Sequence, residues 1–317
     1  MDWNTILIST GTLGGIGAAA AALLAGASRV LRVEEDPRIE QVTEALPGAN
    51  CGGCGFPGCA GFAEAVVAGK ADPTLCAPGG AAIAQTIGDI LGITVEAKQR
   101  QVARLRCQGS KDRAVVRVTY DGMTSCKAVS LLVPLGTKKC AQACEGLGDC
   151  VAVCVFDAIR MGDDGLPVVD EQACTGCGKC VTECPKSVLI LHPYDEKLSV
   201  GCGNQVAPKL VRKVCEVGCL HCRVCVRTCP YDALQWEGNL PKRIDGKCKM
   251  CGLCVEACKT QVLHFASGFE VDPQAKEQAK RLLAERKAAE AAKKAAQRTK
   301  PKETKDPASA PVGGEPS

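Results

Sequence analysis

The chain has 317 residues and a net charge of +4, and aromatic residues make up only 3 % of it. So few aromatic side chains leave little bulk for ordinary hydrophobic cores. Cysteine is abundant instead, with 24 residues, and small domains with weak cores are normally held together by disulfides or metals. No stretch has the basic character of a nucleic-acid-binding surface, so we expect no nucleic-acid partner.

The first 33 residues are expected to form a membrane anchor. Residues 3–28 contain no charged side chain, and this length is sufficient to span a bilayer. A signal peptide would carry positive charge before its apolar run, whereas here Asp2 precedes the run and Arg29 and Arg32 follow it. The positive-inside rule then places the chain in the cytoplasmic membrane, with its N-terminus outside and its bulk on the cytoplasmic side. The alternative is a Gly- and Ala-rich helix buried in a protein core.

Behind the anchor, the clearest feature is an internal repeat. Residues 153–191 resemble residues 228–265, and both stretches run from a cysteine through an aromatic-Asp-Ala turn and a short hairpin to a second group of cysteines. Elsewhere, residue patterns predict a helix over 81–91 and a strand over 113–120. The Ala-, Lys- and Glu-rich stretch from Asp272 to Thr299 predicts a solvated helix without a function, followed by disorder beyond Pro301.

Three cysteine runs share one spacing. They begin at Cys174, Cys219 and Cys248, and each has the Cys-x2-Cys-x2-Cys-x3-Cys pattern of bacterial ferredoxins. Three such cysteines wrap a tight loop around three corners of a [4Fe-4S] cubane, whereas the fourth points away and binds a neighbouring cluster. Because thiols stay reduced in the cytoplasm, we expect metal ligands rather than disulfides. A zinc ribbon would instead use two separated Cys-x2-Cys pairs and leave the third cysteine spare.

This crossed rule assigns ligands within the repeat. In its second half, one cluster is expected on Cys219, Cys222, Cys225 and Cys258, and another on Cys229, Cys248, Cys251 and Cys254. In its first half, the expected sets by analogy are Cys140, Cys144, Cys150 and Cys184, and Cys154, Cys174, Cys177 and Cys180. The gaps after Cys140 and Cys144 are wider than in a ferredoxin loop, which leaves the choice between these two ligands open. Val155 and Lys259 replace a usual proline, which loosens a turn but removes no ligand.

Two further groups of cysteines are less regular. Cys51, Cys54, Cys59 and Cys76 lie in a Gly-rich stretch whose backbone can approach a cluster closely, with zinc as the alternative occupant. The last four cysteines are Cys107, Cys126, Cys202 and Cys215. Either they form a sixth cluster assembled from separated segments, or some of them are buried free thiols. The chain is therefore expected to hold at least five [4Fe-4S] clusters, and six if the last four cysteines bind one.

The expected fold is α+β. It combines an N-terminal transmembrane helix, a small single-cluster domain, two ferredoxin-like modules with two clusters each, and a charged tail. The expected boundaries are 1–33 for the anchor, 34–92 for the single-cluster domain, 93–136 for a linking segment, 137–194 for the first module, 195–214 for a linker, 215–268 for the second module and 269–317 for the tail.

The order of these motifs resembles the B subunits of Rnf/Rsx ion-translocating electron-transfer complexes, in the longer form found in anaerobes. The resemblance rests on the apolar helix followed by EEDP, on CGGCGFPGC with Cys76 in CAPGG, and on CTGCGKCVTECP, and it covers residues 1–268. It implies a complex that couples electron transfer between ferredoxin and NAD to transport of sodium ions or protons. This chain would accept electrons from soluble ferredoxin and relay them to membrane and flavin- or NADH-binding partner subunits, with no catalytic site of its own.

Two other classes of function compete with this relay. One is the iron–sulfur subunit of a soluble dehydrogenase or corrinoid enzyme, whose N-terminal module can look similar, and the other is a zinc-rich interaction protein. His192, His221 and His264 share no spacing typical of a site, and the Gly-rich run at 11–17 lies inside the membrane segment. Because we find no flavin, nicotinamide or nucleophile motif, the sequence favours an electron relay.

Overall fold

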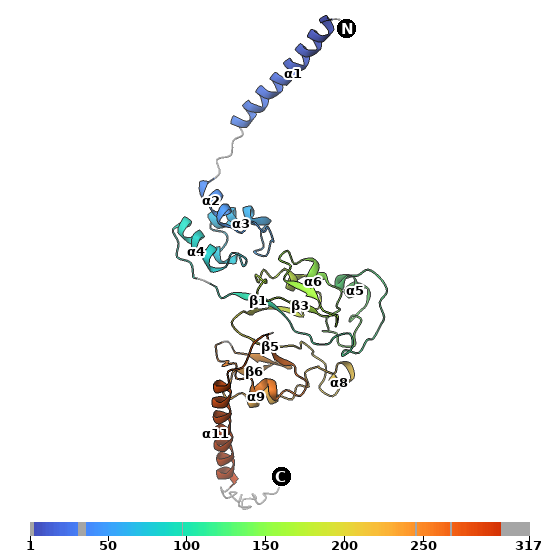
Figure 1. Cartoon of the computed structure of the whole chain (residues 1–317), viewed down its shortest axis with the longest axis vertical. Coiled ribbons are helices and arrows are strands. Elements are labelled where there is room, and N and C mark those ends of the chain that lie inside the picture. Colours follow the sequence, from blue (N-terminus) through green and yellow to red (C-terminus); the bar gives the residue numbers. More distant parts are fainter. Residues whose placement is uncertain (1–2, 31–35, 97, 245, 267, 299–317) are drawn as a thin grey trace, which may run out of the picture. The chain divides into compact units, whose positions relative to one another are not determined.

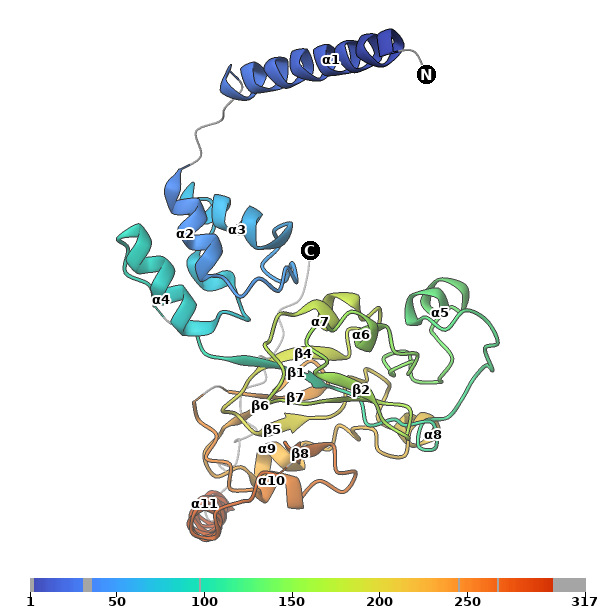
Figure 2. The same ribbon diagram turned by 45° about the horizontal axis from the view of Figure 1, so that its top comes forward.

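The structure is a computed structural model that describes residues 3–30, 36–96, 98–244, 246–266 and 268–298. It divides into two compact units, Met1–Lys98 (unit 1) and Gln99–Ser317 (unit 2), and each unit is described by itself. Figures 1 and 2 show the elements of the chain from two directions. The residues expected to be disordered beyond Pro301, and Arg32, Glu34 and Glu35 behind the anchor, lie outside the described residues.

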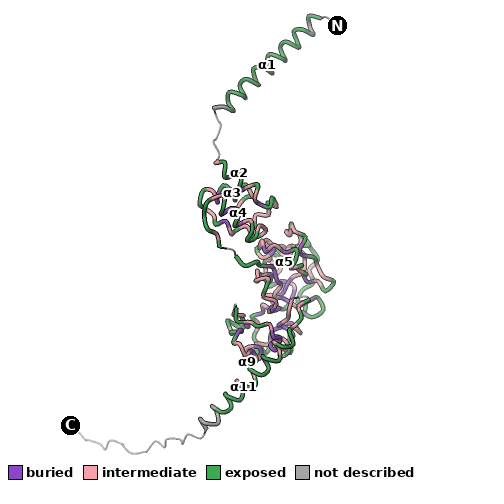
Figure 3. Tube along the Cα trace, turned by 60° about the vertical axis from the view of Figure 1, so that its left-hand side comes forward, coloured by how far each residue is buried: buried purple, intermediate pink, exposed green. Residues whose placement is uncertain are grey.

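Helix α1 (Trp3–Val30) is the apolar segment that the sequence predicts. Its stretch from Leu7 to Ser28 has 22 residues and a mean hydropathy of 1.6, which corresponds to a length of about 33 Å. None of this stretch is buried against the rest of the chain, as the green tube in Figure 3 shows. The structure therefore does not show the alternative of a core helix, and α1 is long and apolar enough to cross a membrane.

The rest of unit 1 is a small helical domain. Helices α2 (Pro37–Ala45), α3 (Gly58–Val67) and α4 (Gly80–Leu91) pack around one core, and a single turn, η1 (Pro73–Leu75), precedes α4. The buried residues of this core are Val42, Leu46, Phe62, Ala63, Val66 and Ile87. The helix expected over 81–91 is confirmed as α4.

Unit 2 contains two copies of one order of elements, βαββαβ. In the first copy, β1 (Gln101–Leu105) pairs antiparallel with β4 (Leu189–Pro193), and β2 (Ile159–Met161) pairs with β3 (Pro167–Val169). The short helix α6 (Asp149–Ala152) precedes the β2–β3 hairpin, and the short helix α7 (Lys179–Glu183) precedes β4. We call this copy, residues 101–193, module 1.

Module 2, residues 198–265, repeats this order. Strand β5 (Leu198–Val200) pairs with β8 (Leu263–Phe265), and β6 (Leu234–Glu237) pairs with β7 (Leu240–Arg243). Helices α9 (Val224–Thr228) and α10 (Leu253–Glu256) take the places of α6 and α7. Each copy is longer than the sequence repeat, because β1 and β5 come from before the repeat and pair with its last strand.

The segment between β1 and α6 in module 1, and between β5 and α9 in module 2, differs most between the modules. In module 1 it contains helix α5 (Cys126–Leu132), whereas module 2 has only the short α8 (Val211–Val214). The expectation of a strand over 113–120 is wrong. Only Ala114 and Val116 form β-bridges there, isolated ones to Cys215 and Lys138. These residues meet loops rather than a partner strand, so no ladder forms.

Helix α11 (Pro273–Arg298) is the expected C-terminal helix. Most of its described side chains are exposed, but Ala279 is fully buried in a cluster with Cys251 and Leu253 of module 2. Arg286 also donates to the carbonyl oxygen of Cys229 at 2.8 Å. The helix is therefore docked on the cysteine-rich end of module 2 and is more than a solvated face.

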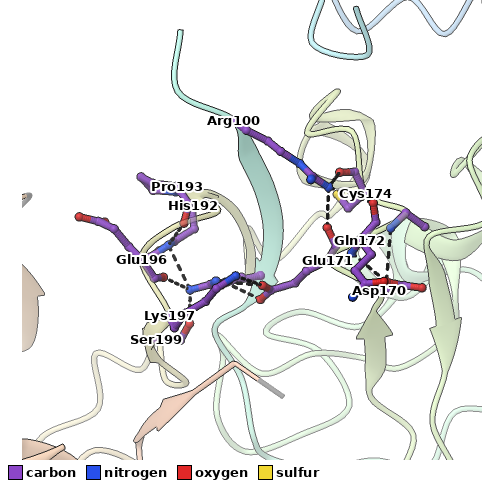
Figure 4. A network of polar contacts seen from close by, with 12 residues as sticks. Arg100, Asp170, Glu171, Gln172, Cys174, His192, Pro193, Glu196, Lys197 and Ser199 are labelled. Atoms are coloured by element: carbon purple, nitrogen blue, oxygen red, sulfur yellow. Dashed lines mark hydrogen bonds and ion pairs between the residues drawn. The ribbon is translucent and has the colours of Figure 1, made fainter. Parts of the chain in front are cut away.

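A buried arginine ties the two modules together. Arg104 on β1 is 6 % exposed, and its guanidinium donates to both carboxylate oxygens of Glu171, at 2.8 and 3.1 Å. The same group donates to Ser199 on β5 at 3.1 Å and lies 3.2 Å from Nδ1 of His192, within the network of Figure 4. Burial and, to a smaller extent, the Arg104 charge lower the pKa of His192 to about 4. A neutral His192 can therefore accept from the guanidinium, whose own charge is paired with Glu171.

Candidate iron–sulfur sites

The four cysteines of unit 1 meet beside its helical core, at site 1: Cys51, Cys54, Cys59 and Cys76. Cys59 lies in the first turn of α3, and Cys76 follows η1. Burial raises the pKa of the Cys76 thiol, and the other three thiols raise it further, which places all four in one group. A Cβ atom on Gly79 would lie 3.2 Å from Cys76 Sγ. The backbone therefore approaches this sulfur as closely as only glycine comfortably allows.

Two of the expected sets in unit 2 each line one small cavity. The cavity of site 3 is lined by Cys154, Cys174, Cys177 and Cys180. The cavity of site 5 is lined by Cys229, Cys248, Cys251 and Cys254. In both sites three cysteines belong to the loop and start of one helix, α7 or α10, and the fourth follows the other helix of the module. This is the crossed arrangement that the spacing predicts.

Site 4 gathers the other expected set of module 2: Cys219, Cys222, Cys225 and Cys258. Burial raises the pKa of Cys219 to about 12 and that of Cys225 to about 11, and the Cys258 thiol contributes to both shifts. Cys222 contributes to the shift of Cys225 although it is the one exposed cysteine of the chain. The four thiols therefore form one group that reaches the surface.

The remaining set of module 1 departs from the expectation. A small cavity is lined by Cys126, Cys144, Cys150 and Cys184, which form site 2. Cys126, the first residue of α5, takes the place expected for Cys140. The Asp149 carboxylate holds it there, because it accepts the backbone N–H groups of Cys126 and Lys127 at 2.9 and 3.1 Å.

Cys140 lies instead between the modules, at site 6. This site has a small cavity lined by Cys107, Cys140, Cys202 and Cys215. The expected sixth set contained Cys126, so the structure exchanges one member between two sets. Cys107 and Cys202 follow β1 and β5 and form an isolated antiparallel bridge with each other. Burial, together with the other three thiols of the site, raises the pKa of Cys140 to about 11.

The sequence carries a signal for this exchange. Four cysteines of module 1 each have a counterpart 75 residues later, in the pairs Cys140 and Cys215, Cys144 and Cys219, Cys150 and Cys225, and Cys154 and Cys229. Cys140 therefore corresponds to Cys215 of site 6, whereas Leu147 stands where Cys222 stands in module 2. Cys126 fills this gap from a separate segment, and the backbone N–H of Leu147 donates to its sulfur.

Contacts between neighbouring groups give the order of the sites in unit 2. Beside burial, Cys150 of site 2 raises the pKa of Cys180 in site 3, and Cys225 of site 4 raises that of Cys254 in site 5. Site 6 joins the two modules: the amide of Cys144 donates to Cys107 Sγ, and that of Cys219 donates to Cys202 Sγ, each at 3.4 Å. The order is therefore 3, 2, 6, 4, 5.

The donor sets suit iron–sulfur clusters. Burial favours the neutral form of these thiols, and a bound metal replaces that proton because it coordinates the thiolate. Backbone amides point at several sulfurs, as they do at Cys107 and Cys202, and such hydrogen bonds stabilise negative charge on a cluster. Within the part of the chain that the structure describes, no group of three or more His, Cys, Asp or Glu side chains is placed to hold one metal ion. The thiols of sites 2, 3, 5 and 6 line cavities instead.

Family models match two of these regions. A family described as "Putative Fe-S cluster" matches residues 46–78, which contain all of site 1. A family described as "4Fe-4S binding domain" matches residues 166–189, which contain three cysteines of site 3 and Cys184 of site 2. Both matches agree with iron–sulfur clusters as the cofactors of these regions.

Curated proteins are similar to this chain over most of its length. The B subunit of the Na(+)-translocating ferredoxin:NAD(+) oxidoreductase complex of Acetobacterium woodii is 42 % identical, over 80 % of this chain and 76 % of that protein. The B subunit of the ion-translocating oxidoreductase complex of Methanosarcina acetivorans is 39 % identical, over 83 % and 99 %. The proton-translocating counterpart of Clostridium ljungdahlii is 38 % identical, over 87 % and 98 %. The chain therefore belongs to the family of B subunits of ion-translocating ferredoxin:NAD(+) oxidoreductase complexes.

Proposed function

We propose that this chain is the iron–sulfur electron-transfer subunit of a membrane complex that couples electron transfer between ferredoxin and NAD to translocation of sodium ions or protons. The observation that carries this proposal is the continuous order of five four-thiol sites through unit 2. A bound [4Fe-4S] cluster supplies a one-electron carrier. The protein's part is to hold such carriers close together and to set the charge and hydrogen bonding around them.

The proposed ligands follow the groups seen in the structure. They are Cys51, Cys54, Cys59 and Cys76 for site 1; Cys126, Cys144, Cys150 and Cys184 for site 2; Cys154, Cys174, Cys177 and Cys180 for site 3; Cys219, Cys222, Cys225 and Cys258 for site 4; Cys229, Cys248, Cys251 and Cys254 for site 5; and Cys107, Cys140, Cys202 and Cys215 for site 6. Modules 1 and 2 are then two ferredoxin-like modules, each with a crossed pair of clusters, joined by site 6.

The domain boundaries and membrane topology complete the proposal. Helix α1 anchors the chain in the cell membrane with its N-terminus outside, since Arg29 and Arg32 flank its other end. The single-cluster domain extends to Lys98, and most of the expected linking segment belongs to module 1, because β1 lies within it and pairs with β4. The partners are soluble ferredoxin as electron donor and the membrane and flavin- or NADH-binding subunits of the complex.

Metal and sulfide content of the anaerobically purified full chain tests the cluster assignment. We expect about 24 irons with matching sulfide, four for each of six clusters. About 20 irons would leave one site empty, and a preparation dominated by zinc would overturn the proposal.

The relay role has its own test. Reduced ferredoxin, added to the loaded protein without air, should reduce its clusters, as followed by electron paramagnetic resonance. A fully loaded protein that reduced ferredoxin leaves oxidised would contradict the role of acceptor. Carbonate extraction of membranes distinguishes the competing soluble-enzyme class, because an intact chain anchored by α1 should stay in the membrane fraction.

A further inference from the structure

A buried lysine lies beside site 6. Lys138 is 6 % exposed, and its ammonium group donates to the carbonyl oxygen of Gly109 at 2.8 Å. No carboxylate among the described residues forms an ion pair with it; the nearby Glu145 pairs with Lys186 instead. A buried cation without a counter-charge is strongly disfavoured. A negatively charged group is therefore expected close to the Lys138 ammonium group.

Gly109 connects this ammonium group to the sulfurs of site 6. A Cβ atom on Gly109 would lie 3.4 Å from Cys215 Sγ and 3.6 Å from Cys107 Sγ. The residue that binds the ammonium group thus packs directly against two sulfurs. The chain also places Lys138 only two residues before Cys140. A thiolate-bound cluster in site 6, which carries net negative charge, is the counter-charge that this geometry provides.

A buried amide contacts the same site. Asn204 is 3 % exposed, and its Nδ2 donates to Cys202 Sγ at 3.1 Å and to the carbonyl oxygen of Cys219 at 3.4 Å. Its Oδ1 accepts the N–H of Val206 at 3.0 Å, which fixes which end of the amide faces the sulfur. The amides of Cys144 and Cys219 add two more donors to sulfurs of this site.

The buried polar residues other than Lys138 and Asn204 do not offer such surroundings to a site. In the described part of the chain they are Arg104, Ser110 and Ser199. Arg104 carries the only charge of this group, and Glu171 neutralises it. Lys249 beside site 5 is exposed, so water and salt screen it. Lys179 beside site 3 is partly exposed, and Lys186 beside site 2 is neutralised by Glu145. Site 6 therefore combines a buried, unneutralised cation with a buried side-chain donor to sulfur.

We propose that Lys138 and Asn204 give site 6 the highest reduction potential in unit 2, so that electrons from either module collect at the junction between the modules. Positive charge and hydrogen bonds to sulfur both favour the reduced, more negative state of a cluster. Site 6 gains one electron and its neighbour in site 2 or site 4 loses it, with ferredoxin as the ultimate donor. This inference rests on the proposed function, since it requires a cluster in site 6.

Redox titration of the loaded full chain, followed by electron paramagnetic resonance, tests the role of the lysine. In Lys138→Met, the component that is reduced first should move to a more negative potential. It should stay in place in Lys138→Arg, which keeps the charge, and in Lys139→Met, which removes an exposed neighbouring charge. Asn204→Leu should cause a smaller shift in the same direction. Unchanged potentials in Lys138→Met at full iron content would overturn the proposal.

Removal of the site gives a second test that does not depend on the folding of Lys138 variants. Cys202→Ala should lose about four irons together with the component of highest potential. If it loses a component of lower potential instead, the assignment of the highest potential fails while the relay function stands. If the unmodified chain holds about 20 irons and Cys202→Ala loses none, site 6 holds no cluster, and that part of the proposed function fails with the inference.

Discussion

Modules 1 and 2 share one order of strands and helices but complete one of their sites in different ways. In module 2, the cysteines of site 4 come from a regular ferredoxin run and from Cys258. In module 1, Leu147 stands where that run has Cys222, and the missing thiol comes from Cys126, about twenty residues earlier, at the start of α5. The modules therefore keep four thiols around a cavity while the segments that supply them differ.

The same comparison explains residues that have no role in a regular ferredoxin loop. Asp149 of module 1 corresponds to Val224 of module 2 by the shift of 75 residues. Its carboxylate accepts two backbone N–H groups of α5 and the hydroxyl of Ser125, at 3.0 Å for the hydroxyl. At this position a carboxylate is thus present only in module 1, where one ligand of site 2 comes from outside the loop and has to be held in place. Module 2 needs no such anchor, because Cys222 lies in the loop itself.

The largest expected effect comes from moving the ligand back into the loop. Cys126→Ala should lose the cluster of site 2, about four irons per chain. The double variant Cys126→Ala with Leu147→Cys should regain them, because residue 147 corresponds to Cys222 and its backbone already contacts the Cys126 sulfur. Iron content and the electron paramagnetic resonance spectrum of the reduced protein measure both effects.

Cys222→Ala in module 2 is the matched control for this rescue. It should lose the cluster of site 4 and should not be rescued by Leu147→Cys. Full iron content in Cys126→Ala would show that Cys126 is not a ligand of site 2. In that case Cys140 would regain its place as the candidate, and the difference between the modules would disappear.

A smaller effect is expected from the anchor of α5. Asp149→Ala removes the acceptor of two backbone N–H groups, and the loss of such hydrogen bonds costs about 1–3 kcal/mol. Because α5 carries Cys126, site 2 should release its iron to a chelator faster than in the unmodified chain. Asp149→Asn keeps one acceptor oxygen and should lie in between, whereas Val224→Ala should leave site 4 unaffected. Equal rates of iron release in Asp149→Ala and the unmodified chain would argue against this anchoring role.

The contrast between the modules also shows at which sites the sequence pattern is sufficient to predict the four cysteines of a group. The groups at sites 3, 4 and 5 follow from spacing, because a Cys-x2-Cys-x2-Cys loop fixes three thiols locally and the fourth follows the paired helix of the same module. Sites 2 and 6 each take thiols from separated segments, so local spacing leaves their membership open. Comparison of the two modules assigns Cys140 to site 6, because its counterpart is Cys215. Cys126 has no counterpart in module 2 and belongs to no local cysteine run, so the sequence does not assign it.

Strands, like cysteine groups, follow from the sequence pattern only where their partners are local. The hairpins β2–β3 and β6–β7 lie within the repeat and are local, whereas β1 and β5 have only five and three residues and find their partners far along the chain. The stretch at 113–120 has stronger strand character than either, yet it lacks a partner and forms only isolated bridges. Burial of Ala279 on module 2 was equally unforeseen, because the composition of α11 shows a charged helix and not what it contacts.

The smallest expected effect concerns the residue that precedes α6 in module 1 and α9 in module 2. Gly148 precedes α6 and Arg223 precedes α9, both with positive φ, 88° and 58°. A Cβ atom on Gly148 would meet only Met161 Cγ, at 3.9 Å, so Gly148→Ala should lower stability by about 1 kcal/mol through backbone strain alone. Arg223→Gly relieves that strain but removes the guanidinium 5.1 Å from the Trp236 ring centre, a contact worth about 0.5–1 kcal/mol. Its stability should therefore stay nearly unchanged. Thermal unfolding of the loaded proteins measures the difference, and an unchanged midpoint in Gly148→Ala would show that module 1 tolerates a side chain there as module 2 does.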